Sequence, residues 1–181
     1  MTSAACQQRA IIALIVGIMS SRQIPADAQG AVRIRGHTLL CLQGFRGEGY
    51  SAGFIENMAA LHRDLNENPG WWVEVVEAPD TFCAACPHLA PAGCSLNSAR
   101  SEEGMQAQDR HVLELLGLQP GTRVRWREVL DRIRTSVKGS DLPGICGSCR
   151  WLPLGYCRDG IDQLREGQVI SVRALRKDEK P

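Results

Sequence analysis

The chain has 181 residues, of which 44% are hydrophobic and 23% charged, and its formal net charge is +1. This is the composition of an ordinary globular protein, so it excludes a disordered, collagen-like or coiled-coil chain. Residues beyond position 28 carry equal numbers of basic and acidic side chains. That balance excludes the basic excess typical of nucleic-acid binders. The unusual feature is the presence of eight cysteines, so cysteine chemistry is where the function is to be sought.

Residues 1–31 are expected to form an N-terminal extension that precedes the folded domain. Residues 10–19 are an unbroken apolar run, which is too short to span a bilayer, because a span needs about 20 residues. The run and the following Ala26-Asp27-Ala28 have the pattern of a secretory signal peptide. The alternative is that Met19 is the true start of translation.

Residues 32–166 are expected to form one small, mainly helical domain with one or two short strands, an α+β fold. An extended segment at 32–35 precedes a short helix at 37–42. Ser51 has the side chain of a helix N-cap, and the helix that follows has the apolar period of a core-facing helix. That apolar stripe consists of Phe54, Met58, Leu61 and Leu65. Residues 71–77 are rich in aromatic and β-branched side chains, which predicts a strand.

The second half of the domain is predicted to be helical, with charged residues at its end. Ser101 caps a helix with Glu102 and Glu103 in the first turn, where acidic side chains suit the helix dipole. Its apolar stripe consists of Met105, Val112 and Leu116. A further amphipathic helix is expected at about 126–137, and a last short helix carries Ile161 and Leu164. The tail at 167–181 is charged and without pattern, so we expect it to be flexible.

Two segments of the domain repeat one spacing of cysteines. Both have the form C-x2-C-x7-C, with a leucine three positions after the second cysteine. A C-x-x-C turn brings two thiolates and nearby backbone N–H groups to one cation or cluster. The repeated spacing therefore predicts two cysteine-rich metal-binding loops. Their ligands would be Cys83, Cys86 and Cys94 in the first loop, and Cys146, Cys149 and Cys157 in the second.

Each loop supplies three ligands, whereas a closed zinc site or a cubane cluster takes four. Cys41 and His37 are the candidates for the missing two, because residues four apart lie on the same face of a helix. Which of them completes which loop is left open by the spacing. Cys41 has a rival interpretation as a buried core thiol. His37 has a rival interpretation as a hydrogen-bonded structural residue.

Other side chains near the loops are weaker candidates. His88 lies in the first loop, but the matching position of the second loop is Trp151, so a shared ligand role is not expected. Phe82, Trp151 and Tyr156 are expected to shield a metal centre from water, which tunes the potential of an iron–sulfur cluster. Ordinary packing accounts for the three aromatic residues equally well.

The motifs together resemble those of domain of unknown function 1284, a family of bacterial and archaeal proteins. The resemblance covers about residues 32–165, and its motifs are Arg35-Gly36-His37-Thr38-Leu39-Leu40-Cys41, residues 44–51, Cys83-Ala-Ala-Cys86-Pro87 and residues 146–157. It implies an iron–sulfur protein, because the uncharacterised members of that family are suspected of binding such clusters. Because members typically begin near the Arg-Gly-His motif, it also favours a cytoplasmic location, with a periplasmic one the alternative if residues 1–28 act as a signal.

The sequence thus predicts a protein with one or two iron–sulfur clusters, of the [4Fe–4S] type, for electron transfer or redox sensing. A structural zinc module is the first alternative. The second alternative is an enzyme in which a three-cysteine cluster leaves one iron open to substrate. The expected partner is a redox protein of unknown identity, with no nucleic acid and no membrane for the folded domain.

Overall fold

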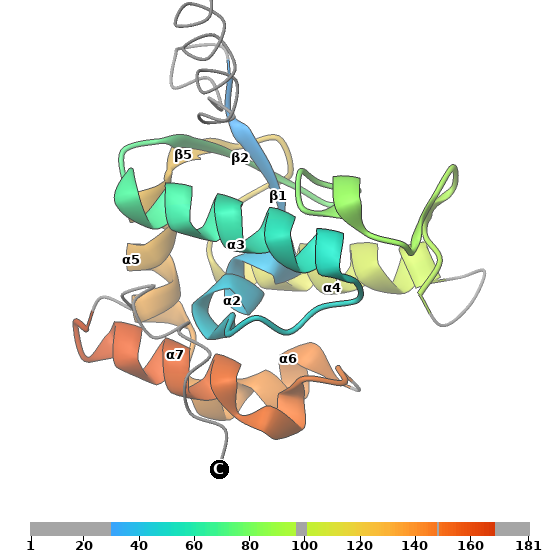
Figure 1. Ribbon diagram of the computed structural model, residues 1–181. Helices are drawn as coiled ribbons and strands as arrows, with labels where there is room; N and C mark the ends of the chain where they lie inside the picture. The colour runs from blue at the N-terminus through green and yellow to red at the C-terminus, as the bar shows by residue number, and fades with distance from the viewer. Residues whose placement is uncertain (1–29, 97–100, 148, 169–181) are drawn as a thin grey trace, which may run out of the picture. The chain divides into compact units, whose positions relative to one another are not determined.

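The computed structural model describes residues 30–96, 101–147 and 149–168. The predicted N-terminal extension up to residue 29 and the tail beyond residue 168 lie outside this part of the chain. The helices within it are α2 (Gly36–Gly44), α3 (Ala52–Glu67), α4 (Ser101–Leu115), α5 (Trp126–Ser136), α6 (Leu142–Cys146) and α7 (Tyr156–Arg165) (Figure 1). No helix in the described ranges is long and apolar enough to cross a membrane.

The strands form a three-stranded sheet and a separate two-residue pair. They are β1 (Val32–Arg35), β2 (Trp72–Val76), β5 (Arg123–Arg125), β3 (Leu89–Ala90) and β4 (Gly93–Cys94). In the larger sheet β1 pairs in parallel with β2, and β2 pairs antiparallel with β5. A parallel pair needs a crossover connection, which α2 and α3 provide. The domain is mainly helical with short strands, so the predicted α+β class is confirmed.

Most predicted elements lie where the apolar pattern placed them. The hydroxyl of Ser51 accepts a hydrogen bond from the N–H of Phe54 at 3.2 Å, as an N-cap does. All four residues of the predicted α3 stripe are buried. Three elements were not predicted: β5, the β3–β4 pair and α6. Each is only two to five residues long, so none contains enough residues to show a hydrophobic period.

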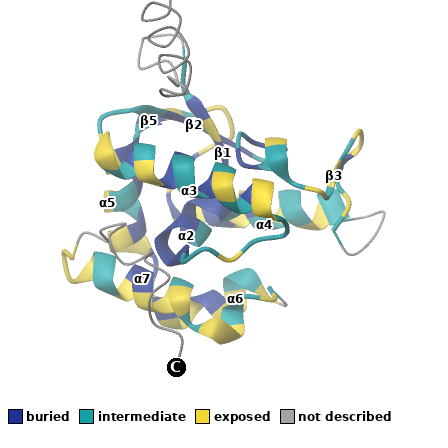
Figure 2. Ribbon diagram, in the orientation of Figure 1, coloured by how far each residue is buried: buried dark blue, intermediate teal, exposed yellow. Residues whose placement is uncertain are grey.

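Helix α2 is the element on which the candidate site is built. Most of its residues are buried, and it appears as a largely dark-blue segment in Figure 2. A Cβ atom at Gly36 would collide with the backbone of Asp109 on α4, and one at Gly44 would collide with the backbone of Cys157 on α7. Because both positions are glycine, α4 and α7 approach α2 closely. Asp109 and Cys157, which are distant in sequence, therefore lie at opposite ends of this short helix.

Candidate metal centre

All seven cysteines of the domain line one cavity of about 380 Å³. They come from α2, from the segment between β2 and α4, and from the stretch that runs from the last residue of α6 into the first turn of α7. The seven are partly buried, and none of them forms a disulfide. His37 lines the same cavity. The structure therefore brings together every residue that the sequence proposed as a ligand: Cys41, Cys83, Cys86, Cys94, Cys146, Cys149, Cys157 and His37.

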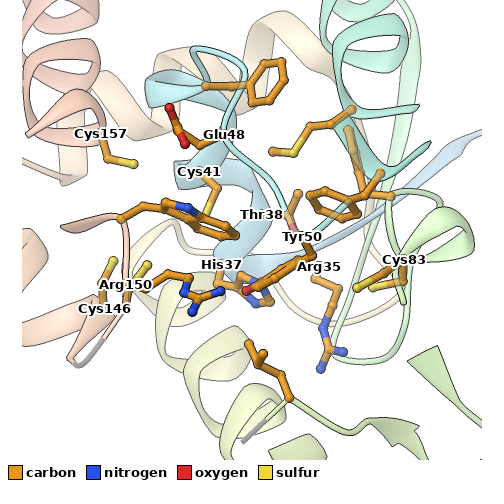
Figure 3. A pocket seen from close by; sticks show the side chains of 18 of the residues that line it. Arg35, His37, Thr38, Cys41, Glu48, Tyr50, Cys83, Cys146, Arg150 and Cys157 are labelled. Atoms are coloured by element: carbon orange, nitrogen blue, oxygen red, sulfur yellow. The ribbon is translucent and has the colours of Figure 1, made fainter. Parts of the chain in front are cut away.

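The cysteines divide into two groups within this cavity. Cys41, Cys146 and Cys157 lie on one side of the view in Figure 3, and Cys83 lies on the other. Burial raises the pKa of the Cys41 thiol well above its usual value, and the neighbouring thiols of the second loop raise it further. Those neighbours are Cys157, Cys146 and Cys149. Cys41 thus lies with the second loop, and this group contains four thiols.

The two C-x-x-C segments share a pair of backbone hydrogen bonds but differ in backbone conformation, because Cys83–Ala85 form the 3-10 turn η1 whereas Gly147 has a φ of 54°. In the first loop the N–H of Cys86 donates to the carbonyl of Cys83 at 2.9 Å, and the N–H of Leu89 donates to the carbonyl of Cys86 at 3.1 Å. In the second loop the equivalent bonds, Cys149 to Cys146 and Leu152 to Cys149, are each 3.1 Å long. The repeated cysteine spacing is therefore matched by a repeated pair of hydrogen bonds, the second of which reaches the shared leucine.

Beyond the leucine the loops diverge. The first loop closes through the β3–β4 pair, in which Leu89 is the register partner of Cys94. The second continues through a 3-10 turn, η3 (Leu152–Leu154), and Gly155 then begins α7 with a φ of 75°. Its third cysteine, Cys157, lies in the first turn of that helix. The same cysteine spacing is thus closed by a strand pair in one loop and by a helix in the other.

Two carboxylates fix the backbone of the first loop. Asp80 accepts hydrogen bonds from the N–H of Cys83 at 2.9 Å and from the N–H of Arg35 at 2.8 Å. Glu102, at the start of α4, accepts from the N–H of Cys94 at 2.7 Å. Both ends of the loop are therefore held by acidic side chains from outside it. Because hydrogen bonds to ionised groups are stronger than neutral ones, these contacts position the thiols even though the loop buries little apolar surface.

Asp80 and Glu102 both bind Arg35, the first through its backbone N–H and the second through its guanidinium. The Arg35 side chain is 1% exposed. Its guanidinium bonds Glu102 through both terminal nitrogens, at 3.0 and 2.9 Å, and Asp109 through Nε at 2.7 Å. A planar guanidinium suits such paired contacts. A buried charge is tolerated only when it is paired and hydrogen-bonded, and here two carboxylates satisfy the one cation. The result is a charged cluster that joins β1, α4 and the first loop.

Asp109 also holds His37. Its Oδ1 lies 2.6 Å from Nδ1 of His37 and accepts from the backbone N–H of His37 at 3.0 Å. Burial by itself raises the pKa of Asp109, but the hydrogen bonds and charge of His37, together with Arg35, outweigh this and hold the pKa below its usual value. An ionised carboxylate only accepts hydrogen bonds. Nδ1 of His37 is therefore the donor of this bond, and Nε2 is the ring nitrogen left for another partner.

Aromatic side chains separate the two groups of thiols. The ring of Tyr50 packs against Trp151 of the second loop, with centroids 4.7 Å apart, and against His88 of the first loop at 4.9 Å. Phe82 is buried and lines the cavity. Of the three aromatic residues expected to shield a centre, Tyr156 is the most open, at 37% exposure, and it lines the cavity as well.

The thiols surround a volume and do not converge on one point. Among the described residues, no three histidine, cysteine or acidic side chains are grouped so as to hold a single metal ion. In a tetrahedral zinc site the sulfurs lie about 3.8 Å apart, because each Zn–S bond is about 2.3 Å long. A cluster of several iron and sulfide atoms is larger than one ion and holds its thiolates further apart. The donor set and the cavity are therefore compatible with such a cluster.

Sequence reasoning missed the charged residues that support this cavity. Asp80 and Asp109 were not singled out, and Glu102 was interpreted only through the helix dipole, although it also holds Arg35 and Cys94. Arg35 appeared only as part of the motif that resembles a family. One feature of the sequence could have indicated the buried arginine: Arg35 stands beside Gly36, where β1 ends and α2 begins. A glycine there lets another backbone approach closely, and that approach buries the neighbouring arginine side chain.

The fold and the site define a small cysteine-rich α+β domain with one cavity lined by thiols. The chain matches the family described as Protein of unknown function (DUF1284) over residues 49–155. Since this is more than half of its length, the chain belongs to that family, and the resemblance noted in the sequence is confirmed. His37, Cys41 and Cys157 lie outside the matched range. Comparisons with curated proteins and with solved structures gave no match.

Proposed function

We propose that this protein holds an iron–sulfur cluster on Cys41 and the three cysteines of the second loop, and uses it for electron transfer or redox sensing. The observation that carries the proposal is that all seven cysteines of the domain line one cavity, with Cys41, Cys146 and Cys157 on one side of it (Figure 3). Four thiolates are the ordinary ligand set of a [4Fe–4S] cluster. Such a cluster supplies one-electron chemistry when it is bound.

A cluster accounts for the arrangement of these thiols better than an isolated ion does. Burial raises the pKa of Cys146 to about 12 and that of Cys157 to about 11, and neighbouring thiols add to both shifts. Partly buried thiolates that repel one another need a cationic centre to ionise together. Seven thiols around one cavity are more than a single ion binds, which favours a centre with several metal atoms. A structural zinc site remains the competing proposal, since sets of four cysteines bind zinc as well.

The surrounding side chains would shield and tune the cluster. Trp151 and Tyr50 pack between the two loops, and the buried Phe82 lines the cavity near the first loop. Apolar rings of this kind limit the access of water and lower the local dielectric, which tunes the potential of an iron–sulfur centre. The first loop offers three more thiols for a second centre. Two centres in one cavity would let the domain accept and pass on electrons within itself.

The test is to purify the protein without oxygen and to measure iron, acid-labile sulfide and zinc. We expect iron and sulfide in about equal amounts, a brown colour and an EPR signal after reduction. Cys149→Ser removes a ligand of the second-loop group and should lower the iron content. Cys6→Ser changes a cysteine of the N-terminal extension and should leave it unchanged. Zinc without sulfide would favour the structural alternative, and protein free of metal would leave the thiols as inert core residues.

A further inference from the structure

The first loop has three thiols but no fourth cysteine, because Cys41 lies with the second loop. Other polar side chains line the same cavity, and most of them are already engaged. Asp80 accepts bonds from two backbone N–H groups, and Gln108 donates to the carbonyl of Ile145 at 3.2 Å. Glu48 is exposed. The nitrogen donors that remain are His37 and His88.

Of these two histidines, His37 is oriented as a metal ligand. Its Nδ1 is bound to a carboxylate that has no exposed surface and is itself paired with Arg35. A carboxylate or carbonyl partner on one ring nitrogen is the usual way in which proteins fix the tautomer and orientation of a metal-binding histidine. The second ring nitrogen, Nε2, makes no hydrogen bond among the described residues. Most of the His37 side chain is covered, at 23% exposure, and the residue lines the cavity.

A chain of hydrogen bonds through Asp109, Arg35 and Glu102 links His37 to the first loop. His37 lies four residues before Cys41, about 6 Å along the helix axis at 1.5 Å per residue. Arg35 precedes it by two residues and is tied to Asp80 and Glu102, the two carboxylates that hold the ends of the first loop. Figure 3 shows His37 between Cys146 on one side and Cys83 on the other. The N-terminal end of α2 is thus linked to the first loop, and its later turn is linked to the second.

We propose that Nε2 of His37 is the fourth ligand of an iron–sulfur centre on Cys83, Cys86 and Cys94. This inference rests on the proposed function and assigns its second centre. Three thiolates and a neutral imidazole carry one negative charge fewer than four thiolates. Replacing thiolate by imidazole raises the reduction potential of an iron–sulfur centre. The first-loop centre would therefore have a higher reduction potential than the second-loop centre. A single electron would then reside on the first-loop centre at equilibrium.

The experiment uses pulsed EPR on the reduced whole chain grown with ¹⁵N-labelled histidine. A coordinated imidazole gives a ¹⁵N hyperfine coupling to the cluster electron spin, which a histidine that only packs nearby does not match in size. We expect this coupling in the wild type and in His88→Ala, which removes the other cavity histidine. We expect it to be lost in His37→Ala. In His37→Cys, a thiolate should restore the cluster without the nitrogen coupling and lower its potential.

The outcomes separate this inference from the function on which it rests. Iron and sulfide present with no histidine coupling would overturn the role of His37 and leave the cluster proposal standing. Coupling that disappears in His88→Ala and persists in His37→Ala would overturn it in favour of His88. Absence of iron and sulfide from the wild type would overturn the proposed function itself. If His37→Ala does not fold, labelled His88→Ala decides the matter, because His37 is then the remaining histidine that lines the cavity.

Discussion

Asp109→Asn tests whether the charged cluster around Arg35 holds the domain together. Asp109 has no exposed surface, and it bonds Nε of Arg35 at 2.7 Å and Nδ1 of His37 at 2.6 Å. Asparagine keeps the shape but loses the charge, and its amide group turns one acceptor into a donor. Removing one partner of a buried ion pair costs about 3–5 kcal/mol. Because Glu102 still pairs with Arg35, we expect the low end of this range, about 3 kcal/mol.

The assay is urea unfolding followed by tryptophan fluorescence under reducing conditions, on protein of known metal content. The matched control is Glu77→Gln, which removes an ion pair to Arg110 of 3.0 Å whose side chains are 37% and 49% exposed. Exposed pairs of this kind contribute about 0–1 kcal/mol. An Asp109→Asn variant no less stable than Glu77→Gln would refute the reasoning, since it would mean that the buried cluster contributes no more than a surface pair.

Three further changes have definite expected outcomes. Burial lowers the pKa of His62 from 6.5 to about 4, so its neutral form is favoured by folding. Wild-type stability should then fall by about 3 kcal/mol between pH 7 and pH 4, and urea unfolding of His62→Gln should show a smaller fall. Cys41→Ala should release iron, as measured by metal analysis. A thiol that only packs would cost about 1–2 kcal/mol, on the order of a small core truncation, and keep the metal. In Gly160→Ala the new Cβ would collide with the carbonyl of Gln43, so thermal unfolding should show a lower Tm, whereas Gly104→Ala, which enters open space in a helix, should raise it.

The sequence predicted best those features whose residues lie within one short segment of the chain. Ser51 and the apolar stripe behind it predicted α3, and the repeated cysteine spacing predicted two loops, which share a pair of backbone hydrogen bonds. Each of these features is defined by residues within a short stretch of the chain. The charged cluster is different in kind, because Arg35 and Asp109 are separated by 74 residues. A periodic pattern within one segment cannot predict that two side chains so far apart in sequence form a contact.

The grouping of the ligands illustrates the same limit. The spacing of His37 and Cys41 correctly placed both on one helix, but it did not say which loop each of them faces. That depends on how α2 is packed, and the packing is set by glycines at its two ends. Gly36 allows the close approach of α4, and Gly44 allows that of α7. A glycine in a sequence does not indicate which distant backbone will pack against it.

A single nine-residue helix supplies a candidate donor to each group of thiols. Two independent loops would each need a fourth ligand from a separate element, and each would fold around its metal alone. Here Cys41 and His37 stand on the same face of α2, so the position of one fixes the position of the other. Because α2 is buried and α4 and α7 approach it closely at Gly36 and Gly44, one packing arrangement sets the positions of both donors. Under the proposed assignment, metal binding at one loop would therefore stabilise the packing that presents the donor to the other loop, and the two centres would be coupled in stability.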